Sequence, residues 1–165
     1  DSDITGYEFN FQQDFEFLPA PFDGMFIALN LTWTDGDSTF KFEDNQSFTT
    51  PFRKLSDKQE NFSIGYDKGK FDIRLAMNSR GEYLDWLADE ESDIDKVSLQ
   101  NSRFVAPHEQ WDLKASYEIN DNFRLKFEIT NIEDRPEYYY WGYNDRLSQY
   151  DEYGTSYAIG FTYNN

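Results

Sequence analysis

Four consecutive aromatic residues, Tyr138 to Trp141, are the part of this sequence with the clearest potential for chemistry. Aromatic rings carry a large apolar area, and a soluble loop rarely exposes four of them in a row. Their faces can stack on a sugar ring, while the polar residues that follow offer hydrogen-bond donors and acceptors. The segment therefore contains a candidate substrate-binding set: Tyr139, Tyr140, Trp141, Asn144 and Arg146, with Asp145 beside them.

The same rings have a second interpretation, in which they anchor the segment instead of contacting a ligand. Tyr and Trp are stable where an apolar environment meets water, because each ring has a polar atom at its edge. We favour anchoring as the main role of Tyr140 and Trp141, with ligand contact second. Replacing either residue with alanine is then expected to impair folding more than it changes ligand preference.

No other residues form a convincing catalytic or metal site. The sequence has no cysteine and one histidine, His108, which we interpret as a surface residue. The acidic run at 89–95, "DEESDID", invites a calcium interpretation, but it lacks the glycine turn and spacing of a calcium loop. We interpret it as a solvated acidic loop. Charges such as Glu8 and Glu128 suit cross-strand pairing better than paired catalysis. We predict no enzymatic activity, no cofactor and no metal.

Composition narrows the class of protein. The 15 Lys and Arg against 32 Asp and Glu give a net charge of −17, which would repel a nucleic-acid backbone. Aromatic residues make up 19% of the chain, unlike a disordered acidic tail. No stretch approaches the roughly 20 apolar residues of a membrane-spanning helix. We therefore exclude nucleic acid as a partner and expect a folded chain with a special distribution of apolar residues.

That distribution is alternation with a period of two, which is typical of β-strands. No segment argues for a helix. Seven segments alternate: residues 6–17, 26–33, 62–66, 71–78, 111–119, 123–130 and 154–163. We predict an all-β, seven-stranded antiparallel meander in chain order. The predicted faces separate two sets of residues, with Glu8, Asp72, Lys114 and Glu128 opposite Phe9, Ile73, Leu113 and Phe127.

Two short turns suggest strand registers. Glycine supplies the positive φ of a two-residue turn, so we centre one turn on Lys68-Gly69 and the other on Asp121. The first places Tyr66 opposite Phe71 and Ile64 opposite Ile73. The second predicts three cross-strand pairs: Tyr117 with Leu125, Glu118 with Arg124, and Lys114 with Glu128. In both registers apolar residues meet apolar ones, and in the second acids meet bases.

Short and long connections alternate along the chain. The short ones cover 18–24, 67–70 and 120–122, and the long ones cover 34–59, 84–109 and 133–153. Long alternating strands with short turns at one end and long loops at the other are typical of outer-membrane β-barrels. A soluble antiparallel sheet with its apolar face turned inward would alternate in the same way.

The strand count argues against a complete barrel. Bacterial membrane barrels use an even number of strands and at least 8. Seven strands leave two unpaired edges, which lipid does not tolerate. We expect the strands at 6–17 and 154–163 each to pair with other β-structure, either the rest of a barrel or neighbouring copies.

The order of these segments resembles the C-terminal part of TonB-dependent outer-membrane receptors. "GYEFNFQQDFEFLPAPFDG" looks like the family's "G-E" strand and "LP-G" periplasmic turn, and "NFSIGYDKGKFDIRLAMNSRGEYL" is similar to the next hairpin. "WDLKASYEINDNFRLKFEITNIEDRPEYYYWGYN" resembles the closing hairpin and the start of the last long loop. The resemblance covers nearly all of residues 1–165.

This resemblance implies a role and a set of partners. The family's barrel has 22 strands, of which these would be the last seven, and its plug domain and TonB-contacting segment have no counterpart in this sequence. The implied function is uptake of a scarce, bulky nutrient, an oligosaccharide or a ferric siderophore, across the outer membrane. The "RPEYYYWG" form of the last loop looks most like the carbohydrate-uptake branch. The implied partners are the rest of the barrel, the plug and outer-membrane lipid, with TonB contacted only through the N-terminal part.

One alternative stays open at this point: a soluble or self-assembling β-sheet module that pairs through its open edges. The two interpretations differ in where the outward-facing residues lie. They face lipid in a receptor and are buried between protein layers in a module. The residues that decide are Tyr7, Phe9, Leu29, Leu75, Leu113, Phe127 and Phe161.

Overall fold

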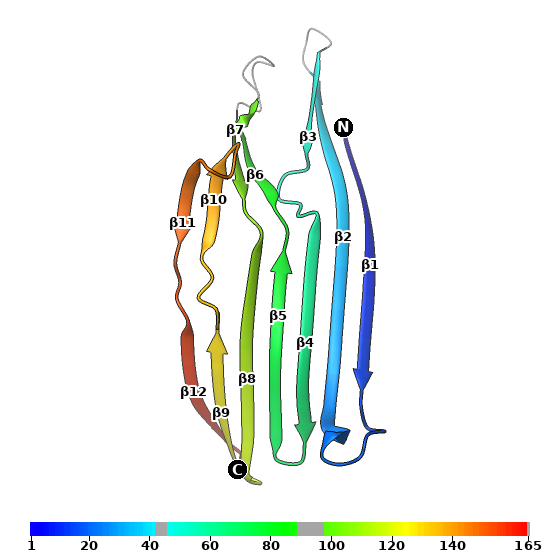
Figure 1. Ribbon diagram of the computed structural model, residues 1–165, viewed down its shortest axis with the longest axis vertical. Helices are drawn as coiled ribbons and strands as arrows, with labels where there is room; N and C mark the ends of the chain where they lie inside the picture. The colour runs from blue at the N-terminus through cyan, green and yellow to red at the C-terminus, as the bar shows by residue number, and fades with distance from the viewer. Residues whose placement is uncertain (42–45, 89–97, 165) are drawn as a thin grey trace.

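The structure, a computed structural model, describes residues 1–41, 46–88 and 98–164. Its largest element is an antiparallel sheet, here called the long sheet, whose strands follow one another in chain order (Figure 1). They are β1 (Ser2–Asp14), β2 (Met25–Lys41), β4 (Lys58–Lys68), β5 (Phe71–Arg80), β8 (His108–Asn120), β9 (Phe123–Thr130) and β12 (Ser156–Tyr163). β3 (Ser47–Pro51) pairs with the end of β2. The predicted seven-stranded meander is confirmed.

A second antiparallel sheet, here called the short sheet, has the order β11-β10-β7-β6. Its strands are β6 (Tyr83–Ala88), β7 (Ser98–Val105), β10 (Glu137–Trp141) and β11 (Leu147–Asp151). Figure 1 shows the short sheet at the end of the molecule opposite the turns that join β4 to β5 and β8 to β9. Two of the segments expected to be long loops therefore form a sheet of their own.

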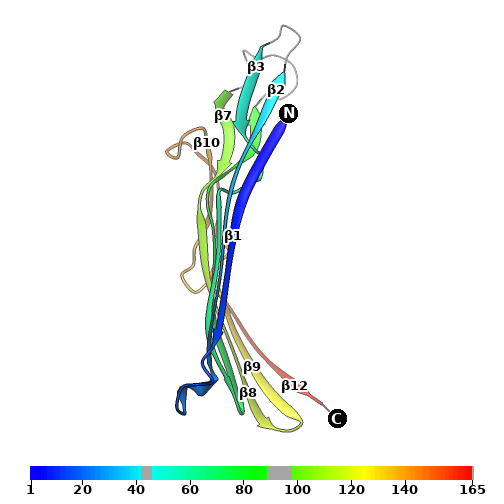
Figure 2. The same cartoon turned by 90° about the vertical axis from the view of Figure 1, so that its right-hand side faces the viewer.

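The long sheet is a single curved layer, seen from its edge in Figure 2. One of its faces is apolar across the seven strands: Leu75 lies between Ile64 and Leu113, and Phe127 pairs with Ile159. None of the seven residues that decide between the two interpretations is buried, and Phe161 is 71% exposed. The described residues place no second protein layer over this face, as expected for a surface that contacts lipid.

The opposite face of the long sheet is polar, and the predicted separation of the two faces is confirmed. Lys114 Nζ lies 2.9 Å from Glu128 Oε1, and Arg124 forms an ion pair with Glu118. Both pairs follow the register predicted for the turn at Asp121, which also sets Tyr117 opposite Leu125. That register is confirmed.

The register predicted for the other hairpin is wrong by two residues. Tyr66 lies opposite Ile73 and Lys68 opposite Phe71, so the turn residues are Gly69 and Lys70. Gly69 has φ +64°, and glycine at the first of two turn positions is typical of a type II′ turn. A slip of two residues keeps every side chain on its predicted face, because the period of a strand is two.

The ends of several elements also differ from expectation. β1 ends at Asp14, and residues 15–17 belong to the turn, where the rings of Phe15 and Phe17 lie 5.9 Å apart. A single 3-10 turn, η1 (Phe22–Gly24), leads into β2. Within the described ranges no helix is long and apolar enough to span a membrane, and no cluster of three or more potential metal ligands occurs. The acidic run at 89–95 lies outside the described residues.

Candidate ligand-binding site on the short sheet

Strand β10 carries three of the five candidate binding residues and lies between β11 and β7. Tyr139 is opposite Val105, Tyr140 opposite Phe104 and Trp141 opposite Arg103. On its other side, the pairing of β10 with β11 shifts register between Tyr139 and Tyr140. Because side chains alternate along a strand, Tyr139 and Trp141 share one face of the short sheet and Tyr140 points to the other.

Tyr140 belongs to the core. Its side chain is 5% exposed, and its ring stacks on Phe104 with centroids 5.6 Å apart. Its hydroxyl donates a hydrogen bond to the Glu82 carboxylate. Burial, and then the hydrogen bond to Glu82, raise the pKa of Tyr140, so its hydroxyl keeps its proton. The side chain is occupied by packing, in agreement with the anchoring interpretation.

Trp141 is half-buried and contacts a residue that sequence reasoning missed. Its ring meets Trp86 edge to face, with centroids 5.8 Å apart and planes at 87°. Trp86 is 46% exposed and lies in β6, inside a segment expected to be a loop. The register of β6 against β7 shifts on both sides of Trp86. These bulges break the alternation that would have indicated a strand, so the sequence pattern gave no signal for this ring.

Asn144 and Arg146 lie in the turn that joins β10 to β11, and both side chains are exposed. The Tyr138 hydroxyl donates a hydrogen bond of 2.7 Å to the Asn144 carbonyl, and Arg146 Nη1 donates one of 2.8 Å to the Gln100 carbonyl. The first bond fixes the turn against β10, and the second fixes it against β7. The side-chain amide of Asn144 is left at the surface.

Gly142 explains how the turn can lie so close to β7. Its φ is +66°, and a Cβ at this position would sit 2.3 Å from the Gln100 carbonyl oxygen. Its N–H donates a hydrogen bond of 2.9 Å to the Ser102 carbonyl. Only glycine allows both the left-handed backbone and the close approach. The glycine in "YYYWG" is therefore required by the geometry that places Trp141 and Arg146.

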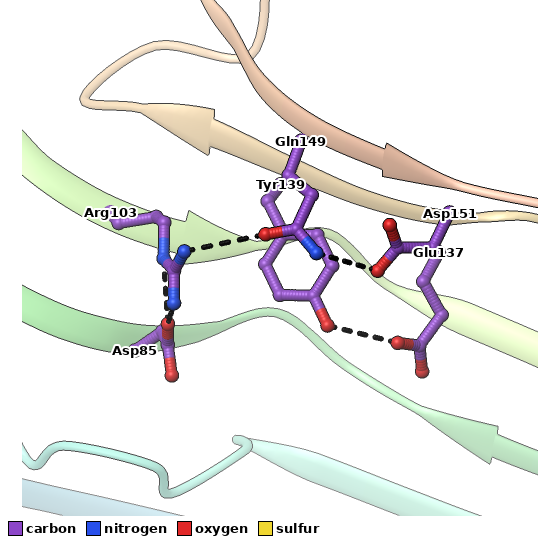
Figure 3. Close-up of polar contacts among 6 residues, drawn as sticks. All are labelled: Asp85, Arg103, Glu137, Tyr139, Gln149 and Asp151. Atoms are coloured by element: carbon purple, nitrogen blue, oxygen red, sulfur yellow. Dashed lines mark hydrogen bonds and ion pairs between the residues drawn. The ribbon is translucent and has the colours of Figure 1, made fainter.

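Tyr139 is held by charged neighbours (Figure 3). Its hydroxyl donates a hydrogen bond of 2.9 Å to Glu137 Oε2, and the Arg103 guanidinium carbon lies 5.3 Å from its ring centroid. Burial, and then the bond to Glu137, raise the pKa of Tyr139 to about 12. Glu137 also accepts a bond of 3.2 Å from Arg80 at the end of β5. The long sheet and the short sheet are thus joined through one carboxylate.

A second chain of polar contacts crosses the short sheet (Figure 3). Arg103 Nε donates a hydrogen bond of 2.7 Å to Asp85 Oδ2. Its Nη1 reaches Gln149 Oε1 at 3.5 Å, and Gln149 Nε2 donates a bond of 2.7 Å to Asp151 Oδ2. Residues on β6, β7 and β11 are thereby linked. Such a network holds its members in fixed positions, which favours recognition of a ligand with a defined pattern of polar groups.

The structure brings together part of the candidate set. Tyr139 and Trp141 lie on one face with Arg103 and Trp86, and Asn144 and Arg146 lie in the adjacent turn. Tyr140 is on the other side of the sheet, within the core. The described arrangement has exposed ring surface next to ordered polar groups. It offers contacts for a hydroxyl-rich molecule, and among the described residues it contains no nucleophile paired with a general base.

The long sheet defines the class of this protein. Alternating strands, one exposed apolar face, one polar face and short turns at a single end are the features of a transmembrane β-barrel segment. A family model, "TonB dependent receptor-like, beta-barrel", matches residues 1–132. The chain therefore belongs to the TonB-dependent receptor β-barrel family, as the sequence resemblance indicated. Members of this family are receptors and transporters of the outer membrane, not enzymes.

A solved structure supports the fold. The crystal structure of the siderophore receptor PiuA from Acinetobacter baumannii matches 98% of this chain with a TM-score of 0.63 and 13% sequence identity. The matched region is 22% of the PiuA chain, so this chain spans about a fifth of that protein. A search of curated proteins gave no match.

Proposed function

We propose that this chain is the C-terminal barrel portion of a receptor that takes up a scarce, bulky nutrient of the oligosaccharide class. The observation that carries the proposal is the exposed ring of Trp86 against Trp141, beside the ordered polar groups of the short sheet. Rings of this kind stack on the apolar faces of sugars, and the neighbouring polar groups bond to hydroxyls. Within this proposal, Tyr139, Trp141, Asn144 and Arg146 contribute to substrate binding and Tyr140 supports them from the core.

Other parts of the receptor supply the remaining functions in this proposal. The plug and the TonB-contacting segment come from outside residues 1–165. The two outer strands, β1 and β12, each have one paired neighbour among the described residues, β2 and β9. Unpaired backbone groups are costly where water is excluded. We therefore assign the free edges of β1 and β12 to pairing with further strands of the same barrel.

Hydrogen exchange tests this assignment of the edges. In the complete receptor, the amides of β1 and β12 should be protected to the same degree as those of the central hairpin β4–β5. Exchange at solvent rates in both outer strands, with β4 and β5 protected, would show that the edges are open and that the barrel assignment is wrong.

Ligand binding by the complete receptor in detergent tests the substrate class. We expect linear oligosaccharides to bind, and Trp86→Ala to weaken this binding about tenfold, which corresponds to about 1.4 kcal/mol. Tyr153→Ala, which removes a ring that is 71% exposed in the linker between β11 and β12, is the matched control and should leave affinity unchanged. Ferric siderophores are the second class, since PiuA is described as a siderophore receptor. Binding of ferric siderophores alone would replace the oligosaccharide assignment.

A further inference from the structure

A hollow of about 560 Å³ lies on the polar face of the long sheet, beside the start of the short sheet. Its volume is within the range of small-molecule sites. It is lined by residues of β4, β5 and β8, by Tyr83 of β6, and by the segment that precedes β4. This hollow is separate from the exposed rings of Trp86 and Trp141, neither of which lines it.

The charge of the hollow is opposite to that of the chain. Three of its lining residues are basic, namely Lys54, Arg80 and His108, and among the described residues that line it none is acidic. The chain as a whole carries a net charge of −17. Arg80 and His108 are direct cross-strand partners on β5 and β8, and the Lys54 N–H donates a bond of 2.8 Å to the Leu84 carbonyl. Strand register therefore fixes the backbone positions of Arg80 and His108, and a backbone bond fixes that of Lys54.

The guanidinium of Arg80 has unused bonding capacity. Its Nη2 bonds to Glu137, and its carbon lies 5.1 Å from the centroid of the Tyr83 ring. Its Nη1 is buried and has no hydrogen-bond partner within the described part of the chain. A buried donor without an acceptor is unfavourable, and guanidinium nitrogens bond well to carboxylate and sulfate oxygens. Neither Lys54 nor His108 has a described carboxylate within ion-pair distance.

Neutral amides complete the lining. Asn61, Asn78 and Gln110 are cross-strand neighbours on β4, β5 and β8, and all three line the hollow. Strands in a sheet are about 4.8 Å apart, so these amides form a row with donors and acceptors at regular intervals. An amide can bond to a hydroxyl in either direction. The row therefore suits a ligand that carries several hydroxyls.

We propose that this hollow binds the anionic group, a carboxylate or a sulfate, of a hydroxyl-rich ligand. Lys54 and Arg80 meet the charged group, and the amide row meets the hydroxyls. The net negative charge of the chain repels anions, whereas the basic residues of the hollow attract them. An anionic ligand is therefore directed to the hollow. This inference deepens the proposed function, because it assigns an acidic saccharide as the expected form of the substrate.

Calorimetry on the complete receptor in detergent tests the inference with three probes: trigalacturonate, ferric citrate and neutral maltotriose. We expect trigalacturonate to bind more tightly than maltotriose and its affinity to fall as salt is raised. Arg80→Gln and Lys54→Gln should each weaken trigalacturonate about tenfold or more. Lys54→Gln serves as the second variant because Lys54 has no described ion pair whose loss would disturb folding.

Lys126→Gln is the matched control. Lys126 is a cation on the same face of the long sheet, but its cross-strand partner Ser116 is eight residues along β8 from His108, or about 26 Å. The Lys126→Gln receptor should bind trigalacturonate as tightly as the unmodified receptor does. Equal loss in all three variants would show a general charge effect and overturn the assignment of the hollow.

The other outcomes separate this inference from the proposed function. If maltotriose binds as tightly as trigalacturonate and neither Arg80→Gln nor Lys54→Gln matters, the hollow is not an anion site although the oligosaccharide class stands. If only ferric citrate binds, and does so through Arg80 and Lys54, the anion site stands and the saccharide class is wrong. If neither anionic probe binds, the anion site is overturned.

Discussion

The long sheet and the short sheet are stabilised in different ways. The buried apolar residues among those described all lie in the short sheet: Leu84, Leu87, Ala88, Val105 and Tyr140. Phe40 and Phe48, from the ends of β2 and β3, pack against the cluster formed by Leu84 and Leu87. The long sheet has no comparable core among the described residues, and its large apolar side chains are exposed on one face. One part of the chain therefore buries its apolar surface in protein, while the other relies on lipid.

The ion pairs of the two sheets differ in the same sense. In the long sheet, Lys114 and Glu128 have side chains that are 64% and 42% exposed. In the short sheet, Arg103 and Asp85 are 31% and 15% exposed. Exposed pairs contribute little to stability, whereas partly buried pairs in a network fix geometry. The difference indicates that the polar face of the long sheet is held by its strands, and that the short sheet depends on its side chains.

The largest expected effect comes from removing the central ring of the short sheet. Tyr140→Ala removes the stacking on Phe104 and the bond to Glu82, and leaves a cavity. We expect a loss of about 3–5 kcal/mol in the free energy of unfolding. Surface expression of the complete receptor and resistance of the short sheet to proteolysis measure the effect.

Tyr143→Ala is the control for this substitution. Tyr143 is 54% exposed in the neighbouring turn, and its described contacts there are made by its backbone. Removing its ring should change stability by less than about 0.5 kcal/mol. Normal expression of Tyr140→Ala together with lost uptake of one substrate would make Tyr140 a binding residue and contradict its place in the core.

The next effect concerns the apolar face of the long sheet. Leu75 lies near the middle of β5, and Leu75→Arg would place a charge between Ile64 and Leu113. Arginine on the lipid face near the bilayer midplane costs about 2–4 kcal/mol. Ala76→Arg, one residue further along on the polar face, should cost much less. Unfolding of the complete receptor in lipid vesicles measures both, and equal costs would mean that the face of Leu75 does not contact lipid.

The contrast between the sheets explains what could be predicted from the sequence. Strands of the long sheet face lipid on one side and a polar space on the other, so strict alternation is required along their whole length. That requirement made all seven strands, their order and their faces predictable. The Lys68-Gly69 turn was misplaced because φ > 0 can fall at either position of a two-residue turn, and only the packed hairpin shows that Gly69 comes first.

The short sheet could not be predicted in this way. Its strands are short, and register shifts at Trp86 and between Tyr139 and Tyr140 interrupt their alternation. The aromatic run in β10 indicated where the site lies. That Tyr140 is in the core while Tyr139 and Trp141 lie on the other face depends on the neighbours that each residue contacts. Trp86 and Arg103 could be found only once β6 and β7 were seen to pair beside β10. The candidate binding role of this surface stays a prediction.

The junction between the sheets gives a smaller effect. Asn131 follows β9, is 4% exposed and has φ +57°. Its N–H donates a bond of 2.9 Å to Asp112 Oδ1, and its side chain bonds to the backbone of Arg135 in both directions. Asn131→Ala removes the side-chain partners of the Arg135 N–H and carbonyl, which lie at a partly buried site, and should cost about 1–3 kcal/mol. Asn131→Asp keeps the acceptor for the Arg135 N–H and should cost less. Equal losses of unfolding free energy would show that the side-chain bonds contribute nothing.

The smallest effect is a pH dependence confined to the short sheet. Burial and the bond to Glu137 raise the pKa of Tyr139 from 10.0 to about 12. Between these values the unfolded chain releases the proton while the folded chain keeps it, so the unfolded state binds fewer protons and stability falls as pH rises. Below pH 10 both states are protonated and the full contribution is present.

Tyr139→Phe removes this titration, while the raised pKa of Tyr140 is common to both proteins. Proteolysis between pH 10 and about 12 measures the stability of the short sheet. This stability should fall more steeply with pH in the unmodified receptor than in Tyr139→Phe. The variant also lacks the bond to Glu137, so its stability starts lower and the two curves approach each other as pH rises. Parallel curves would mean that Tyr139 ionises alike in both states. The short sheet would then not enclose the Tyr139 hydroxyl, and the contrast with the open faces of the long sheet would be weaker at this residue.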